Sequence, residues 1–237
     1  MIAEVTEVAG PAGTAAVVRL AGPLTFDTAP SARTHLLKAV AVQPVVVVAD
    51  VAELEVRDDV ALTLFPAVAR HAAAWPGIPL VLAAPSRWLR AALERTAVMR
   101  YVPVEATVAA ACAAVDGTPP RRVTELMAGG PETVSTARAV VRAACLRWEQ
   151  SAISETAELI MSELASNAVR HAGGIIEISV SVRRRYLHLS VRDRSYEQAR
   201  IGRNNGRGLM LVDAMTTGWG STELPDGKVV WATLPHA

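Results

Sequence analysis

Short apolar runs and helical apolar patterns alternate along the first half of the chain. The runs are uninterrupted and rich in β-branched residues, which is typical of strands covered on both faces: "PVVVVADV" and "IPLVLAAP". The segment "AAVVRLAGPL", which precedes them, is a candidate for a first pair of strands. The remaining segments carry apolar residues at helical spacing: "TAPSARTHLLKAVA", "RDDVALTLFPAVARHAAAW" with an internal proline, "SRWLRAALERTA" and "ATVAAACAAV". This alternation predicts an α/β domain with helices laid against a sheet.

The second half has a different order, with two helices followed by strands. The helices are "ETVSTARAVVRAACLRW" and "SETAELIMSELASNAVRHAGG", the second ending at a glycine pair that commonly stops a helix. Apolar and polar positions then alternate in "IEISVSVRRRYLHLSVRD", and "KVVWATL" is a last strand. We therefore predict an α/β domain at residues 1–115, a Pro-containing linker at 116–122 and a separate α+β domain at 123–237.

Composition narrows the classes of partner. The chain has 237 residues, of which 51% are hydrophobic, enough for two domains with proper cores. A formal charge of +1 provides no broad electrostatic surface for nucleic acid or an anionic membrane. No apolar run approaches the roughly 20 residues that cross a bilayer, and the start is acidic where a signal peptide would be basic. Two isolated cysteines form no zinc or disulfide pattern. We expect a soluble, cytoplasmic protein.

Three polar residues follow one another at steps of four along the second helix of the second half. At about 100° per residue, Glu163, Asn167 and His171 span roughly 80° of helix surface beside the apolar stripe. A solvated helix edge is the ordinary explanation for each residue alone. Asparagine is unfavourable inside a helix, however, because its amide competes for backbone hydrogen bonds, so Asn167 calls for some compensation.

Strand parity singles out one carboxylate. Leu187, Leu189 and Val191 face the core, and counting on by two places Asp193 on the same inward face. An unpaired charge is costly there, so we expect a partner. A ligand amino group or a cluster of backbone amides would satisfy it, unless the residue lies in a turn that has already reached solvent.

A pair of glycines stands immediately before an apolar helical run. Gly206 and Gly208 let the backbone approach an anion closely, where a helix N-terminus also offers free N–H groups, although most such pairs are simply turns. The segment follows no first strand, as a dinucleotide fingerprint would. The only lysines, Lys38 and Lys228, complete no phosphate-binding Gly-Lys-Ser/Thr loop.

Taken in order, these segments resemble the motifs of a known superfamily. "ELASNAVRH", "VRDRS", "GRGLMLV" and "GKVVWATL" are similar to successive motifs of the GHKL ATPases, and most closely to those of the anti-sigma-factor serine kinases of bacterial partner-switching systems. The resemblance covers roughly Val123 to Ala237. It implies a Bergerat-type ATP-binding sandwich, in which a sheet is backed by helices and ATP lies between a helix and a lid.

The resemblance also implies roles for individual residues. Asn167 is expected to hold Mg²⁺ that bridges the phosphates, and Asp193 to accept a hydrogen bond from the adenine amino group. Glu163 corresponds to the general base that deprotonates the attacking hydroxyl. His171 matches the motif too, but we assign it to helix-end packing and capping. The remaining correspondences are with residues along the phosphates, Gly206, Gly208 and Leu209, and with a position near the adenine, Thr233.

Two departures from the superfamily pattern affect nucleotide binding. Ser195 stands where many members have glycine two places after the adenine aspartate, and the lid "YEQARIGRNN" is short. We therefore expect nucleotide to be held less tightly, or by a different lid.

The first half resembles a STAS domain, the anti-sigma-factor antagonist fold, over about Ala15 to Val115. The likeness rests on "VVVVADVAELEVRDDVAL", which corresponds to the strand, loop and helix start that carry a phosphoacceptor serine in that family. Here the acceptor falls on Asp59, after Asp58, so no hydroxyl is present. A carboxylate carries about one negative charge against roughly −1.5 to −2 for phosphoserine. Asp59 therefore imitates the phosphorylated state imperfectly, or is only a helix cap at a degenerate site.

Together the two resemblances predict a cytoplasmic partner-switching regulator. It would bind Mg-ATP and phosphorylate the loop serine of a separate STAS antagonist, with the helix from Thr133 to Trp148 as a surface for that antagonist or a sigma factor, and with a homodimer as a further option. The alternative is a non-catalytic nucleotide-binding module whose degenerate STAS domain acts as an internal partner. Retention of Glu163 favours the kinase, whereas loss of the acceptor favours the module. A sensor histidine kinase is disfavoured, because no long helix with a phosphoacceptor histidine precedes the ATP domain.

Overall fold

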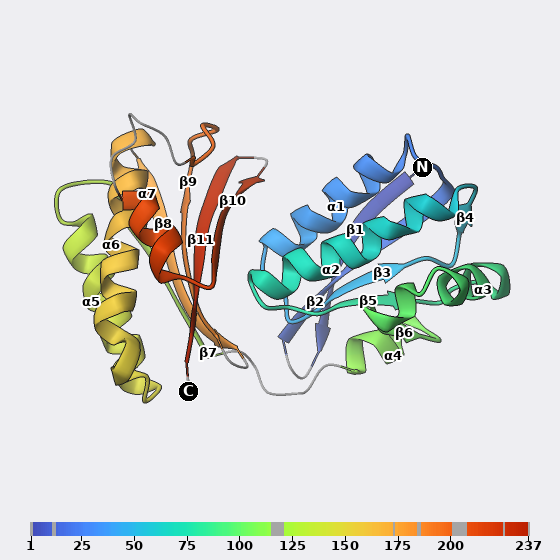
Figure 1. The fold of residues 1–237 in the computed structure, drawn as a ribbon, viewed down its shortest axis with the longest axis horizontal. Coiled ribbons are helices and arrows are strands. Elements are labelled where there is room, and N and C mark those ends of the chain that lie inside the picture. The colour runs from blue at the N-terminus through green and yellow to red at the C-terminus, as the bar shows by residue number, and fades with distance from the viewer. Residues whose placement is uncertain are drawn as a thin grey trace. The chain divides into compact units, whose positions relative to one another are not determined.

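The chain folds as two compact units, residues 1–119 and residues 120–237, each with its own sheet (Figure 1). A computed structural model describes residues 2–10, 13–114, 121–172, 174–183, 186–200, 208–224 and 226–236. Among these residues, no helix is both long enough and apolar enough to span a bilayer.

The first unit is built on a mixed sheet in the order β1-β2-β3-β5-β6, with β4 pairing β2. β1 and β2 form an antiparallel hairpin, and the other pairings are parallel. The strands are β1 (Ile2–Gly10), β2 (Gly13–Leu24), β3 (Val47–Asp50), β4 (Leu54–Val56), β5 (Leu80–Ala83) and β6 (Val104–Glu105). Strand β1 was not predicted, because its apolar side chains are largely exposed and leave no clear inward face in the sequence.

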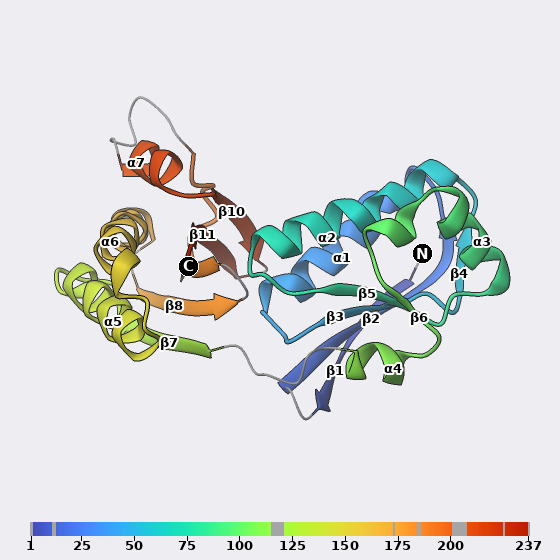
Figure 2. The same cartoon turned by 60° about the horizontal axis from the view of Figure 1, so that its bottom comes forward.

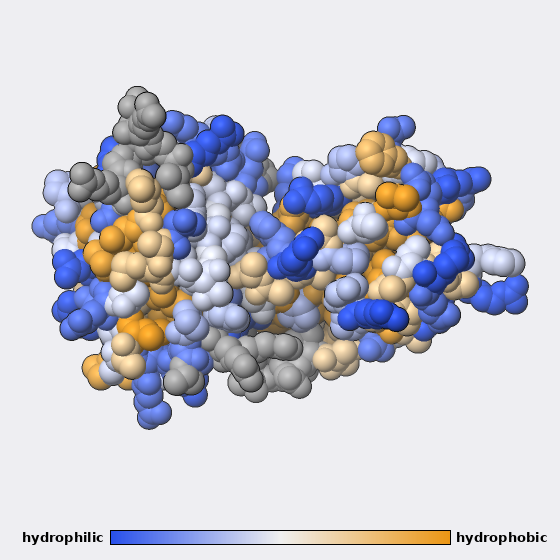
Figure 3. All heavy atoms as spheres, in the orientation of Figure 1, coloured by the Kyte–Doolittle hydropathy of each residue, from blue (hydrophilic) through white to orange (hydrophobic). Residues whose placement is uncertain are grey.

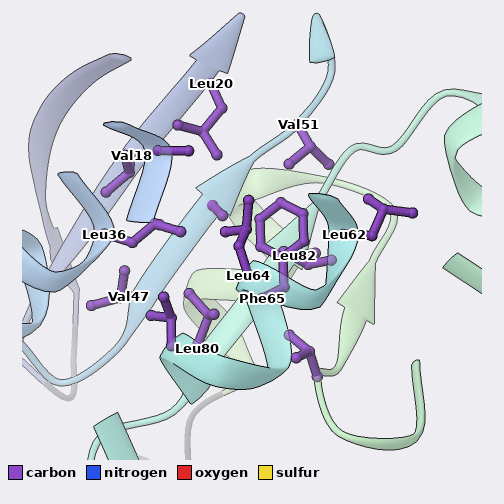
Figure 4. Packing of buried hydrophobic residues seen from close by; sticks show 14 of the residues in the cluster. Val18, Leu20, Leu36, Val47, Val51, Leu62, Leu64, Phe65, Leu80 and Leu82 are labelled. Carbon is purple, nitrogen blue, oxygen red and sulfur yellow. The ribbon is translucent and has the colours of Figure 1, made fainter. Parts of the chain in front are cut away.

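Helices cover both faces of this sheet, α1 and α2 on one side and α4 on the other (Figure 2). Burial on two faces is what the β-branched runs predict: Val47 belongs to the cluster under α1 and α2, whereas Val48 belongs to the cluster under α4. Figure 4 shows Phe65 of α2 packed among the leucines and valines of the larger cluster. The helices are α1 (Ala29–Ala41), α2 (Leu64–Ala74), α3 (Arg87–Arg95) and α4 (Val108–Ala113).

The predicted helix with an internal proline forms as two pieces. A 3-10 turn, η1 (Asp59–Thr63), leads into α2, and Pro66 lies in the first turn of α2, where its missing N–H is not needed. Asp58 caps the first piece, because its Oδ1 accepts a hydrogen bond of 3.0 Å from the Val60 N–H.

The second unit has an antiparallel sheet in the order β10-β11-β9-β8-β7. The strands are β7 (Arg121–Ala128), β8 (Ile175–Arg183), β9 (Tyr186–Asp193), β10 (Gly218–Leu224) and β11 (Gly227–Pro235). Strand β7 was not predicted from the sequence, and Arg121 and Arg122 were assigned to the linker. That assignment is wrong, because both residues pair with β8, opposite Val182 and Ser181. The strand is mostly exposed, so its sequence lacks the alternation that marks a strand.

Three helices lie on one face of this sheet: α5 (Thr133–Arg147), α6 (Ser154–His171) and α7 (Gly208–Met215). One hydrophobic cluster joins all of these elements, with contributions from Val141 of α5, Leu164 of α6, Val212 of α7, Val191 of β9 and Val230 of β11. This shared core fixes α6, α7 and the inward faces of β9 and β11 against one another.

Candidate functional site

The polar edge of α6 is largely withdrawn from solvent. Asn167 is 7% exposed, and Glu163 and His171 are half-buried. His171 is the last residue of α6, and its Nδ1 lies 3.5 Å from Oε2 of Glu197, in the segment that follows β9. The solvated-edge explanation is therefore wrong for Asn167, and the edge faces other parts of the second unit.

The N-terminus of α7 abuts this edge at Glu163. A Cβ atom on Gly208 would overlap the Oε2 atom of Glu163 and would lie 3.2 Å from its Cδ. Glycine at the first position of α7 thus permits an approach that any other residue would prevent without moving Glu163. The first N–H groups of a helix have no partner within it, so the Glu163 carboxylate lies against a helix end that offers hydrogen-bond donors.

Two other residues, Gly206 and Leu209, were predicted to lie along the phosphates. Gly206 lies outside the described residues. Leu209 is buried in the hydrophobic cluster, so its side chain serves packing and only its backbone N–H belongs to the helix start.

Asp193 ends β9 on the inward face of the sheet and is 2% exposed. Its Oδ1 accepts two hydrogen bonds, one of 2.9 Å from Nζ of Lys228 and one of 2.8 Å from the Ser195 N–H. Its Oδ2 is buried and has no hydrogen-bond partner in the described part of the chain. A buried oxygen without a donor is costly, so Oδ2 is a place where a ligand N–H would be stabilised.

Lys228 is the expected partner of Asp193, and its identity was not predicted from the sequence. It is 1% exposed and stands opposite Asp193 in the β9–β11 register, although the two residues are 35 positions apart. Parity in the last strand could have signalled it, because Lys228 lies two residues before Val230, whose side chain faces the core.

Gly227 allows this pairing to form. Its φ is +145°, and a Cβ atom there would overlap the carbonyl oxygen of Asp193 and lie 2.7 Å from Cα of Arg194. The start of β11 therefore passes so close to the end of β9 that only glycine fits, which brings Lys228 alongside Asp193.

Thr233 is not part of this site. It pairs with His188, five residues along β11 from the Lys228–Asp193 pairing, and its hydroxyl donates to the Gly218 carbonyl at 3.1 Å. An odd separation places it on the opposite face of the sheet, about 17 Å away along the strand. The register contradicts the prediction that Thr233 shares a binding site with Asp193.

The groups that remain lie at two places in the second unit. The carboxylate of Asp193 lies at the end of β9, whereas Glu163 and Asn167 lie about one turn apart on α6, with Glu163 against the start of α7. Carboxylate and amide oxygens are the ligands that Mg²⁺ prefers, and a helix N-terminus suits phosphate. These residues fit a magnesium-bound nucleotide, with the unpartnered Oδ2 of Asp193 suited to an amino group of the base.

In the first unit, Asp59 makes a contact that a helix cap does not make. Its Oδ2 accepts hydrogen bonds from Nε and Nη2 of Arg95, at 3.1 and 2.6 Å, while Asp58 supplies the cap. Arg95 lies at the end of α3, so the pair joins the start of η1 to a different helix. The capping explanation is therefore wrong for Asp59 itself.

Each of the two units matches the model of a known protein family. A family model described as a histidine kinase-like ATPase domain matches residues 127–234, and one described as a STAS domain matches residues 5–111. No curated protein sequence matches the chain.

The first unit is also similar to solved structures. One is the anti-sigma factor antagonist SpoIIAA in its unphosphorylated form, with 19% identity over 47% of this chain and 93% of that chain and a TM-score of 0.38. A second is an anti-sigma factor antagonist from Mycobacterium paratuberculosis, with 22% identity over 48% of this chain and 94% of that chain and a TM-score of 0.39. A third is the Bacillus cell fate determinant SpoIIAA in its phosphorylated form, with 18% identity over 47% of this chain and 97% of that chain and a TM-score of 0.36. The assignments rest on the family models, which confirm the two predicted fold classes. The chain thus combines a STAS domain at residues 5–111 with an ATPase domain of the histidine kinase-like, GHKL type at residues 127–234.

Proposed function

We propose that the second unit binds Mg-ATP and transfers its γ-phosphate to a serine of a separate STAS-domain protein, as part of a partner-switching regulator of transcription. The observation that carries the proposal is the buried, unpartnered Oδ2 of Asp193, in a unit where Glu163 lies against the start of α7. Asp193 suits the base of ATP, and Glu163, Asn167 and the start of α7 suit its phosphates.

At the base end, Asp193 accepts a hydrogen bond from the adenine amino group through Oδ2. Its other oxygen is already occupied by Lys228 and Ser195, so the carboxylate has one free acceptor and a fixed orientation. A hydrogen bond to a buried charged group contributes about 1.5–3 kcal/mol, which is a factor of roughly 10 to 100 in affinity.

At the phosphate end, Asn167 would hold Mg²⁺ and the N–H groups at the start of α7 would bind phosphate oxygens. Magnesium, when bound, supplies positive charge that offsets the charge developing on the phosphates. Glu163 orients the attacking serine hydroxyl and accepts its proton as the general base. The contact with Gly208 fixes where the Glu163 carboxylate lies.

The substrate is a separate protein because the first unit has no hydroxyl at the corresponding position. Asp59 occupies that position and is held in an ion pair with Arg95. The absence of a hydroxyl at this position also favours a second candidate function, in which the protein binds nucleotide and switches partners without transferring phosphate. The presence of Glu163 beside Gly208 favours the kinase.

The helical face of the second unit is the proposed partner surface. Apolar side chains gather over this face (Figure 3), and its exposed large apolar residues are Leu146 of α5, Leu159 of α6, and Met210 and Met215 of α7. Exposed apolar residues that cluster in this way are typical of protein interaction sites, and methionine adapts to several partners. A STAS antagonist or a sigma factor is the proposed occupant.

Two measurements test the proposal. Isothermal titration should detect Mg-ATP binding to the wild type and a loss of at least about tenfold in affinity for Asn167→Ala. Transfer of labelled phosphate to candidate STAS proteins should fall at least roughly 100-fold in Glu163→Gln, with ATP affinity retained. The matched control is Glu155→Gln, an exposed residue in the first turn of the same helix. Binding without any transfer by the wild type would establish the non-catalytic module, and absence of binding would refute both functions.

A further inference from the structure

Lys228 and Asp193 form an ion pair that is almost completely buried, at 1% and 2% exposure. Lys228 is one of only two lysines in the chain. Burial of an ion pair is a poor way to stabilise a fold, because the cost of desolvating both charges can exceed their attraction. The pair therefore points to a role in what the Asp193 carboxylate does.

The two carboxylate oxygens of Asp193 differ in the hydrogen bonds that they accept. Nζ of Lys228 and the Ser195 N–H both donate to Oδ1, and no described residue donates to Oδ2. An ionised carboxylate can only accept hydrogen bonds, whereas a protonated one can also donate. The two donors fix the orientation of the carboxylate, so Oδ1 is occupied and Oδ2 is presented as the free acceptor.

We propose that Lys228 is the residue that sets base selectivity in this site: it occupies Oδ1 of Asp193 and leaves Oδ2 as the acceptor that faces the base, so that the site takes 6-aminopurine nucleotides and rejects 6-oxopurine nucleotides. The inference rests on the proposed function, because it requires a nucleotide base at Oδ2. An adenine amino group donates to Oδ2, whereas the carbonyl at C6 of hypoxanthine or guanine would place a second acceptor against it. Two buried acceptors that face each other leave both unsatisfied, which is the strongest basis that a site has for rejecting an analogue.

Removal of the ammonium group should reverse this property. In Lys228→Met the side chain keeps most of its volume but loses its charge, and a carboxylate left alone in a buried position takes up a proton rather than remain charged. A protonated Asp193 can donate to a 6-oxo group. The variant is therefore expected to lose ATP affinity and to gain ITP affinity relative to the wild type.

The test compares the binding of Mg-ATP and Mg-ITP by isothermal titration at neutral pH. The wild type should prefer ATP by at least about 100-fold. In Lys228→Met this ratio should fall at least about tenfold. Lys38→Met is the matched control, since it removes the only other lysine, which is exposed on α1 of the first unit, and it should leave the ratio unchanged.

If Lys228→Met does not fold, the double variant Asp193→Asn with Lys228→Met provides the same test, because replacing both partners by neutral groups avoids a lone buried charge. The Ser195 N–H keeps the amide oxygen at the Oδ1 position, so the amide N–H₂ replaces the acceptor Oδ2, and this variant should prefer ITP. A wild type that binds ATP and ITP equally, or an unchanged ratio in either variant, would overturn the inference while the proposed function stands. Absence of ATP binding by the wild type would instead refute the proposed function.

Discussion

Arg142 of α5 donates two hydrogen bonds, of 3.1 and 2.6 Å, to the carboxylate of the buried Glu158 of α6. Ser154 of α6 donates a third, at 3.2 Å. These groups join the two long helices of the ATPase unit at the end remote in sequence from Asn167. The hydrogen bond from Arg142 is the largest cause that lowers the pKa of Glu158 below its ordinary value of 4.5, and burial opposes the shift.

The lowered pKa of Glu158 predicts an acid-sensitive stability. A carboxyl whose pKa is lower in the folded state stabilises the fold above its unfolded value, and that contribution is lost as the pH falls through the folded pKa. Glu158→Gln should therefore lower the melting temperature of the ATPase unit by roughly 3–8 °C at pH 7. Calorimetry should show the difference from the wild type shrinking below about pH 4.5. A difference that stays constant on acidification would show that the charge is not responsible, and Glu155→Gln controls for loss of a carboxyl from α6.

The contact between Glu163 and Gly208 predicts a selective loss of phosphate transfer. In Gly208→Ala the new Cβ would displace the end of the Glu163 side chain, which can move without unfolding the protein. Transfer to a STAS protein should fall at least roughly tenfold, while the melting temperature changes by less than about 2 °C. Gly130→Ala is the matched control, because a Cβ at Gly130 meets nothing within 4 Å.

A second measurement separates this effect from helix stability. If displacement of the carboxylate is the cause, Gly208→Ala should have almost no further effect in a Glu163→Ala background, since the two residues act through one contact. Additive losses in the double variant would mean that Gly208 acts elsewhere.

Position 59 predicts a gain of function. Asp59 is partly exposed and lies beside Arg95, which suits a phosphate as well as a carboxylate. The wild type should acquire no phosphate between Glu55 and Thr63 when it is incubated with Mg-ATP, whereas Asp59→Ser should acquire phosphate on the new hydroxyl. Mass spectrometry distinguishes the two. Phosphate found in this loop of the wild type would show that the loop has another acceptor, and Asp59→Ala should behave like the wild type.

Gly227 predicts a stability effect that depends on backbone geometry. Gly227→Ala would place a Cβ against the backbone of Asp193 and Arg194 at a φ of +145°, a conformation that residues other than glycine rarely adopt. The free energy of unfolding should fall by about 1–3 kcal/mol, and ATP affinity should fall with it because Lys228 shifts away from Asp193. Chemical denaturation measures the first effect. Gly218→Ala, on the neighbouring strand, meets only an ordinary contact of 3.8 Å with Thr233 and should be well tolerated.

Features set by local pattern were predictable from the sequence. The run "PVVVVADV" became β3 with adjacent valines in clusters on opposite faces, because β-branched residues without polar interruption leave no solvent face. The spacing of Glu163 and Asn167 placed both on one side of α6, because helix geometry alone determines it.

Features set by pairing between distant segments were not predictable. Strand β7 carries mostly exposed residues, so only its hydrogen bonds to β8 define it. Thr233 was assigned to the adenine site by sequence resemblance. The register of β11 with β9 places it on the face of the sheet opposite to Asp193. The same register creates the Lys228–Asp193 pair, which no local pattern contains.

The aspartate at position 59 differs from a phosphoserine in how long its negative charge persists. A phosphate on serine is added by one enzyme and removed by another, so the charge of such a loop records a recent event. An aspartate is part of the encoded sequence, so no phosphatase can remove its negative charge. Under the proposed function, a reversible signal would therefore reach this protein through the nucleotide or through a partner, and not through a change of charge at position 59.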